Sequence, residues 1–341
     1  MKNPPASAPP PAIDRSPVRW LRQNLFNTWY NGILTLILGG FILQVFVAGL
    51  TWIATKARWA VISENLPLLL VGRYPAEQSW RLWLVLLLAI GLPVSIWGGK
   101  RRRSPGVGWI YAFCAMIGIS WLLGGGFGLV PVENSLWNGL LLTLLAASLS
   151  TVLAFPLGVL LALGRQSSLP ILRIACTIYI ELVRGLPLIG ILFMAQFLLP
   201  LLLPGDWRLD RLARAIAGLI LFNAAYLAET VRGGLQSLPR GQIEAAKVLG
   251  LSAPLRLWLI VLPQAIRMVI PAIVGQFISL FKDTSLLALF ALAELTGIAR
   301  SVLAQPDFIG RYAEVYLFIG LIYWIVCFTL SQVSRQLEVR D

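Results

Sequence analysis

Histidine is absent from this 341-residue sequence. Its absence excludes a histidine-ligated metal site, a serine–histidine nucleophile pair and an imidazole proton relay. Cysteine is scarce, and Cys114, Cys176 and Cys327 lie far apart, each inside or beside an apolar segment. They have neither metal-ligand nor disulfide spacing, so we expect them to be small packing residues and expect no metal site.

A phosphate-binding loop is also missing. That loop requires Gly-x-x-x-x-Gly-Lys followed by serine or threonine. The residues that follow the lysines are Asn3, Ala57, Arg101, Val248 and Asp283. We therefore expect no cofactor in this chain, and any ATP and magnesium to be bound by a partner.

Charged residues are few, at 13% of the chain, whereas 58% is hydrophobic. Soluble domains have roughly a quarter charged residues and about half apolar ones. The apolar residues form runs of about twenty, which is the length that crosses a bilayer as a helix. The composition therefore predicts an all-α membrane protein rather than a large soluble protein with buried helices.

The net charge of +13 would suggest a nucleic-acid partner in a soluble protein. In a membrane protein, basic loops on the cytoplasmic side set the orientation, so we expect no nucleic acid here. Lys100–Arg103 indicates one such cytoplasmic loop. The loop charges favour, by about two to one, an orientation with both termini in the cytoplasm.

The apolar runs predict about eight transmembrane helices. The proline-rich start predicts a disordered cytoplasmic tail over residues 1–24, and it is not typical of a signal peptide. In the fifth run, 171–183 is either a short interfacial helix or the foot of a span, and Arg184-Gly185-Leu186-Pro187 breaks the helix. The runs are 29–54, 80–97, 108–130, 136–163, 171–203, 212–229, 257–280 and 312–330.

A polar loop between the sixth and seventh runs has a distinctive pattern. Residues 241–250 read Gly-Gln-Ile-Glu-Ala-Ala-Lys-Val-Leu-Gly. Alanine favours a short rigid helix, and Gly250 can take the left-handed conformation that ends it. The small side chains of Ala245 and Ala246 allow another protein to approach closely. The full pattern is Glu-Ala-Ala, three residues, glycine, nine residues and Ile-x-Leu-Pro. This pattern resembles the EAA loop of ABC importer permeases; the alternative is an ordinary helical loop with a glycine cap.

Four further segments are similar to the polar amino acid (HAAT) permeases, and the likeness extends from Asn138 to the carboxyl end. They are Glu181-Leu-Val-Arg-Gly-Leu-Pro-Leu188, Lys282-Asp-Thr-Ser-Leu286, Tyr226–Gly234 and Leu238–Gln242. At the position of Leu238, isoleucine is the commoner residue in that family. The long amino-terminal part resembles the general L-amino acid branch. The resemblance implies a MetI-like (type I ABC importer) core over 132–341, preceded by three extra helices within 25–131.

The same resemblance implies partners and a mechanism. Residues 241–250 would be the coupling helix, with Gly241, Glu244, Ala245, Ala246 and Gly250 forming the contact with an ABC ATPase. A second homologous permease subunit, in a heterodimer, and a periplasmic amino-acid-binding protein would complete an inner-membrane importer. The chain would be non-catalytic, and alternating access would carry polar amino acids across the lipid bilayer.

Ionisable groups at the membrane are costly and usually functional. Glu181 and Arg184 lie one helical turn apart, so either they pair with each other or they contribute to the substrate pathway. Lys282, Asp283, Thr284 and Ser285 stand between two apolar segments and should interrupt a helix. Broken helices expose polar groups to substrates, so these four residues either line the pathway of a zwitterionic amino acid or only fix helix packing.

An ion-gradient-driven secondary transporter is the alternative. Many such carriers place acids or histidines within paired repeats. Here histidine is absent, acids near the predicted spans are few, and no repeat is evident. A channel would need a selectivity filter and an enzyme a nucleophile–base set, and the sequence resembles neither.

Overall fold

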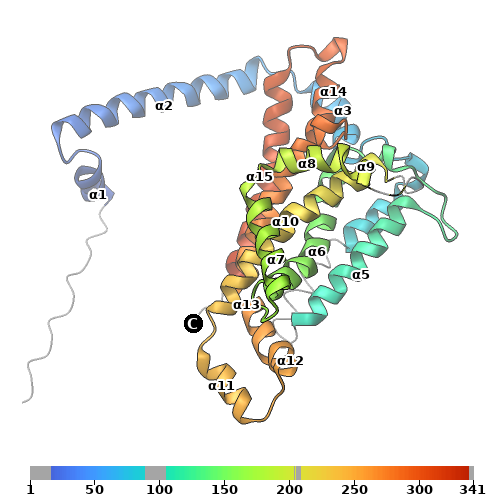
Figure 1. Ribbon diagram of the computed structural model, residues 1–341. Helices are drawn as coiled ribbons and strands as arrows, with labels where there is room; N and C mark the ends of the chain where they lie inside the picture. The colour runs from blue at the N-terminus through green and yellow to red at the C-terminus, as the bar shows by residue number, and fades with distance from the viewer. Residues whose placement is uncertain (1–16, 89–104, 203, 205–208, 338–341) are drawn as a thin grey trace, which may run out of the picture. The chain divides into compact units, whose positions relative to one another are not determined.

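The computed structural model describes residues 17–88, 105–202, 204 and 209–337 (Figure 1). Residues 1–16, the predicted loop Lys100–Arg103 and the second half of the predicted span 80–97 lie outside the described residues. The chain divides into two compact units, Met1–Trp59 and Ala60–Asp341.

The first unit contains two helices. Helix α1 (Pro17–Asn24) occupies residues that the sequence assigns to the tail; its proline stands at the first position, where a missing N–H costs nothing. Helix α2 (Trp29–Thr55) has 27 residues, enough to cross a bilayer. The Thr35 hydroxyl donates to the Leu25 carbonyl oxygen at 2.9 Å, and this bond fixes the turn between α1 and α2.

In the described residues of the second unit, all regular secondary structure is helical, apart from isolated β-bridges. A helix over residues 80–88 also precedes the undescribed segment. The longer helices are α3 (Ala60–Val71), α5 (Pro105–Gly124), α6 (Gly139–Arg165), α7 (Pro170–Gly185), α8 (Leu188–Phe197), α10 (Arg211–Gln236), α11 (Arg240–Val248), α13 (Leu262–Asp283), α14 (Leu295–Leu303) and α15 (Tyr312–Leu337). The short ones are α9 (Leu199–Leu202), α12 (Ala253–Arg256), the π turn η3 (Leu257–Val261) and the 3₁₀ helices η1 (Ala76–Gln78), η2 (Asn134–Leu136), η4 (Thr284–Phe290) and η5 (Pro306–Phe308).

Among the described residues, five helical segments are long and apolar enough to cross a membrane. They are α2, α6, α10, Ala253–Phe290 and Tyr312–Gln336. Helices α7 and α8 make a sixth if they count as one span, although they are bent by 110°. With α5 and the helix at 80–88, the structure agrees roughly with the predicted eight.

The bend between α7 and α8 has a local cause. Pro187 cannot donate a backbone hydrogen bond, and the residue before a proline is disfavoured in helical conformation. Leu186 is extended, with φ −97° and ψ 145°, and Pro187 has ψ 141°. The predicted break at Arg184–Pro187 is therefore confirmed.

Helices α6 and α10 form the centre of the unit. A Cβ atom added at Gly158 would lie 2.7 Å from the Leu227 Cβ and 3.1 Å from the Ala224 carbonyl oxygen. Ala154, Ala224 and several neighbours in this contact are fully buried. Small residues at the crossing let the two backbones approach closely, as in membrane helix pairs generally.

The two helices run in the same direction. Their first turns lie at one end of the unit, where Asn134, before α6, bonds to Asp210, before α10. Their last turns lie at the other end, where Arg165 pairs with Glu229. We call these the Gly139 end and the α11 end; Figure 1 shows α3, α8 and α14 at the first, and α11 and α12 at the second.

A buried carboxylate organises the Gly139 end. Glu294 is fully buried and accepts hydrogen bonds from the Thr296 and Gly297 backbone N–H groups, both at 2.9 Å, which caps α14. Thr143 of α6 and Tyr323 of α15 donate to the same carboxylate at 3.5 and 3.4 Å. One side chain thus joins three helices, and the sequence predicted neither α14 nor α3.

The α6–α10 crossing makes a stability prediction. Gly158→Ala should lower the free energy of unfolding by about 1–3 kcal/mol, because the new methyl group forces apart two helices that are already in contact. The thermal unfolding midpoint of the purified protein in detergent should fall accordingly.

Gly320→Ala on α15 is the matched control, because its Cβ would meet nothing within 4 Å. Its midpoint should stay level or rise slightly, since alanine has the higher helix propensity. Equal midpoints for the two variants would contradict the role given to the crossing.

Candidate functional site

Helix α11 is exposed on the surface of the second unit. Its residues Gly241, Glu244 and Ala245 are exposed. At its carboxyl end Val248 and Leu249 are 88% and 76% exposed. Exposed apolar residues at the tip of a polar loop are typical of a protein contact.

The end of α11 is held by a glycine cap. Gly250 has φ +71°, in the left-handed region, as predicted from the sequence. Its N–H donates to the Lys247 carbonyl oxygen at 2.9 Å, and the Leu251 N–H donates to that of Ala246 at 3.2 Å. This pair of bonds is the Schellman motif, which turns the chain back sharply.

The two alanines of the helix face different ways. Ala245 is exposed, whereas Ala246 is only 2% exposed. Ala246 is thus buried against its own chain, and the expectation that both alanines present a surface to another protein holds only for Ala245.

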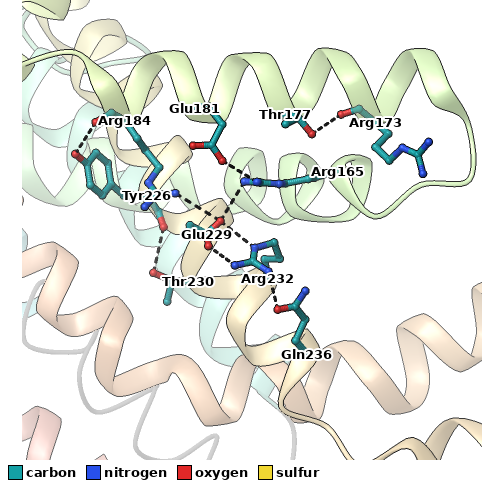
Figure 2. Close-up of polar contacts among 10 residues, drawn as sticks. All are labelled: Arg165, Arg173, Thr177, Glu181, Arg184, Tyr226, Glu229, Thr230, Arg232 and Gln236. Atoms are coloured by element: carbon teal, nitrogen blue, oxygen red, sulfur yellow. Dashed lines mark hydrogen bonds and ion pairs between the residues drawn. The ribbon is translucent and has the colours of Figure 1, made fainter.

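Five charged side chains meet near the ends of α6, α7 and α10 (Figure 2). Glu229 is at the centre. Its carboxylate pairs with Arg165 at 3.2 Å and Arg184 at 3.6 Å, and it accepts from Arg232 Nε at 2.9 Å. Arg165 also donates to Glu181 at 2.7 Å. We call these five residues the charged cluster; with three arginines and two glutamates it has a net charge of +1.

The pairing of Glu181 differs from the simpler sequence interpretation. Glu181 and Arg184 lie one turn apart, but each pairs with another helix: Glu181 with Arg165 of α6, and Arg184 with Glu229 of α10. The Arg184 guanidinium also lies 5.8 Å from the centre of the Tyr226 ring. The two charges therefore connect helices rather than stabilise one.

Polar contacts beside the cluster complete its framework. Figure 2 shows Gln236 accepting from Arg232 at 2.6 Å and the Tyr226 hydroxyl donating to the Arg184 carbonyl oxygen at 3.5 Å. Arg184 Nε is buried and has no hydrogen-bond partner among the described residues. The cluster thus contains one buried donor whose hydrogen bond is not satisfied.

The predicted helix interruption at Lys282–Ser285 is a change of helix type, without a break in the helical segment Ala253–Phe290. The α-helix α13 ends at Asp283, and the chain continues as the 3₁₀ helix η4 from Thr284. Lys282 is exposed, and Asp283 and Ser285 are half-buried. Thr284 is fully buried and donates to the Phe281 carbonyl oxygen at 2.7 Å, at the point where the α-helix passes into the 3₁₀ helix.

The two sets of predicted pathway residues lie at different depths. Glu181 and Arg184 belong to the α11 end. Leu280 and Leu287, which flank Lys282–Ser285, pack with Ala215 near the start of α10, towards the Gly139 end. The structure therefore does not join the two sets into one site.

Three members of the charged cluster were not singled out from the sequence. Arg165, Glu229 and Arg232 lie at predicted span ends, where they were assigned to the orientation of the chain or to a family-like segment. The segment Tyr226–Gly234, which contains two of them, was the available signal. Only the tertiary fold shows that one carboxylate serves three arginines.

Comparison with known proteins gives a consistent result. Residues 154–340 match the family described as binding-protein-dependent transport system inner membrane component. The crystal structure of an amino acid ABC transporter with histidines is similar in fold, with a TM-score of 0.53 and 28% identity, over 60% of this chain and 92% of that one.

Two curated relatives match over nearly their whole length. The inner membrane amino-acid ABC transporter permease protein YhdY of Escherichia coli K12 is 40% identical over 338 residues, covering 94% of this chain and 92% of the relative. The glutamate/glutamine/aspartate/asparagine transport system permease protein BztC of Rhodobacter capsulatus is 33% identical over 417 residues, covering 98% and 95%. The chain belongs to the family of binding-protein-dependent transport system inner membrane components.

Proposed function

We propose that this chain is the non-catalytic permease subunit of an inner-membrane ABC importer for amino acids. The single observation that carries the proposal is α11: a capped, exposed helix with an apolar tip, joined directly to the central helix α10. Family membership favours this function over an ion-gradient-driven carrier, and the names of both curated relatives indicate amino acids as the class of substrate.

Helix α11 docks on a partner ATPase, which binds the ATP and magnesium. Gly241, Glu244, Ala245 and the exposed tip at Val248 form the contact, and the cap at Gly250 holds the helix in place. Only three residues separate α10 from α11, so a movement of the docked helix is passed to α10.

The charged cluster transmits that movement to the neighbouring helices. Arg184 of α7 and Arg165 of α6 both bind Glu229 of α10, so displacement of α10 changes the contacts of all three helices. The substrate pathway runs between this cluster and the Lys282–Ser285 segment. When the partner ATPase closes on ATP, the pathway thus changes from being open at one face of the membrane to being open at the other.

The full importer contains further subunits. A second permease subunit, similar to this chain, encloses the pathway as a heterodimer, and a periplasmic binding protein delivers the amino acid. With α11 on the cytoplasmic side, the Gly139 end faces the periplasm. The loop charges favour an orientation in which both termini lie in the cytoplasm.

Docking through α11 predicts the result of a pull-down. The wild-type chain, extracted from its native membrane in mild detergent, should co-purify with an ATPase identified by mass. Gly250→Val should lose that ATPase, because a β-branched residue is strained at φ +71° and the cap is disrupted. Glu244→Lys should lose it as well, because the exposed face is altered while the fold is not.

Gly126→Val is the matched control, since Gly126 also has a positive φ (+91°), and a Cβ there meets nothing within 4 Å. It lies in the loop after α5, at the Gly139 end, and its variant should retain the ATPase. An intact wild-type chain that brings down no ATPase in several detergents would refute the proposal.

The charged cluster predicts a coupling defect. Glu229→Gln removes the carboxylate that three arginines share. The Arg165–Glu181 pair still joins α7 to α6, but the ionic link from both helices to α10 should weaken. ATP-driven amino acid uptake in proteoliposomes should fall by about tenfold or more, equivalent to about 1.4 kcal/mol. The ATPase should still co-purify, because α11 is untouched.

Two variants calibrate that result. Glu181→Gln removes one ion pair of a side chain that is 55% exposed, so its effect on uptake should be smaller. Glu64→Gln, at an exposed position on α3, should leave uptake unchanged. Normal uptake by Glu229→Gln at wild-type expression would show that the cluster has no part in coupling.

A further inference from the structure

A cavity of about 550 Å³ opens at the Gly139 end, away from the charged cluster and α11. Ligand pockets of a few hundred cubic ångströms are typical sites for small molecules. Three arginines and one aspartate line it, so its ionisable groups have a net charge of +2. They are Arg73, Arg211, Arg214 and Asp210, together with Asn134, Ser135, Asn138 and Ser301 among the polar residues.

The aspartate is already engaged. Asp210 caps α10 by accepting from the Ala213 N–H at 2.7 Å, and it also accepts from the Asn134 side-chain amide. It makes no ion pair with an arginine of the cavity among the described residues. The arginines are therefore not neutralised by the carboxylate that lies beside them.

The arginines retain free donors. Arg214 is held in place by two backbone carbonyl oxygens, those of Gln196 at 2.7 Å and Asp210 at 3.3 Å. The exposed guanidinium groups of Arg73 and Arg211 have no hydrogen-bond or ion-pair partner among the described residues. A guanidinium has five N–H donors arranged to bind a carboxylate through two of them.

The position of Arg73 is set by a rigid loop. Gly72, at φ +67°, leaves no room for a side chain because a Cβ would lie 2.3 Å from that of Asn138. On the other side, Tyr74 donates to the Leu123 carbonyl oxygen at 3.2 Å, and Arg81, only 1% exposed, donates to that of Val130 at 3.0 Å. Burial raises the pKa of the Tyr74 hydroxyl, with Arg81 acting in the opposite direction, so Tyr74 remains a neutral donor.

The cavity lies next to the end of the 3₁₀ helix η4. Its wall includes Ala291, Leu292 and Ala293, which follow directly after η4. Ala291 has φ +54°, a left-handed conformation that is unusual for alanine. The Gly139 N–H donates to the Ala293 carbonyl oxygen at 2.8 Å and fixes this wall to α6. A ligand in the cavity therefore contacts the chain that continues from Lys282–Ser285.

We propose that this cavity is a binding site for the carboxylate groups of a small anionic amino acid, held by Arg73, Arg211 and Arg214. A ligand with two carboxylates and one ammonium group has a negative net charge, which complements the positive net charge of the cavity. An amide in place of the second carboxylate accepts weaker hydrogen bonds, so glutamate binds more tightly than glutamine. The proposal rests on the proposed function in one respect: that function places the cavity on the periplasmic face.

The test uses the purified importer, with its partner subunits, in lipid nanodiscs without binding protein. Titration calorimetry at low ionic strength measures binding of L-glutamate and L-glutamine. Arg73→Gln and Arg211→Gln should each weaken glutamate binding by about tenfold, because each removes one charge-assisted contact. The loss for glutamine should be smaller, and added salt should weaken the wild type towards the variants.

Arg300→Gln is the matched control. Arg300 is exposed on α14, next to Ser301 of the cavity, but it does not line the cavity. Its variant should bind glutamate as the wild type does, and co-purification of the ATPase checks that each variant is assembled.

Two other outcomes overturn the proposal, and a third separates it from the proposed function. Glutamate affinity that is unchanged in Arg73→Gln and Arg211→Gln would exclude the cavity as its site. If the wild type binds no glutamate, while both variants lose stimulation of ATP hydrolysis by the binding protein, the arginines contact an acidic surface of that protein instead. Arginine-dependent glutamate binding by an importer that performs no ATP-driven uptake would support the site and refute the proposed function.

Discussion

The close approach of α6 and α10 is the contact on which the other features depend. Gly158 lies against the Leu227 side chain and the Ala224 backbone, at distances that a larger residue could meet only if the helices shifted apart. Because the two helices start at the same end, this crossing also sets which end groups meet. Arg165 thereby meets Glu229 at one end, and Asn134 meets Asp210 at the other. A wider crossing would disrupt both polar contacts at once.

Helix α10 carries charged groups at both of its ends. Arg211 and Arg214 line the cavity, whereas Glu229 and Arg232 belong to the charged cluster. The helix has 26 residues and is therefore about 39 Å long. It is packed along its length, so we expect it to move as a rigid element. In the proposed function, α10 therefore links the cavity to α11.

Sequence patterns predicted the elements whose signal is local. Runs of apolar residues predicted the long spans, and the glycine at position 250 predicted the end of α11. Helices α3 and α14, with 12 and 9 residues, are shorter than a membrane span, and the cap of α14 draws on Thr143, which is 151 residues from Glu294. The partner of Glu181 was missed for the same reason, because helical spacing indicated Arg184 and the fold supplied Arg165. Local signals identify elements; pairings between distant elements need the tertiary structure.

The apolar α6–α10 crossing and the ion pairs of the charged cluster differ in how easily they open, and this difference indicates which helices move. The α6–α10 crossing is fully buried and apolar, so separating it would create a void without compensating hydrogen bonds. The side chains of Arg165, Arg184 and Glu229 are 23–33% exposed, so water can replace one partner as an ion pair opens. Glu229 also keeps Arg232, on its own helix, when another arginine leaves. We therefore expect α6 and α10 to move together, and the ion pairs that join them to Glu181 and Arg184 of α7 to exchange partners while Ile180 of α7 stays buried in the same core.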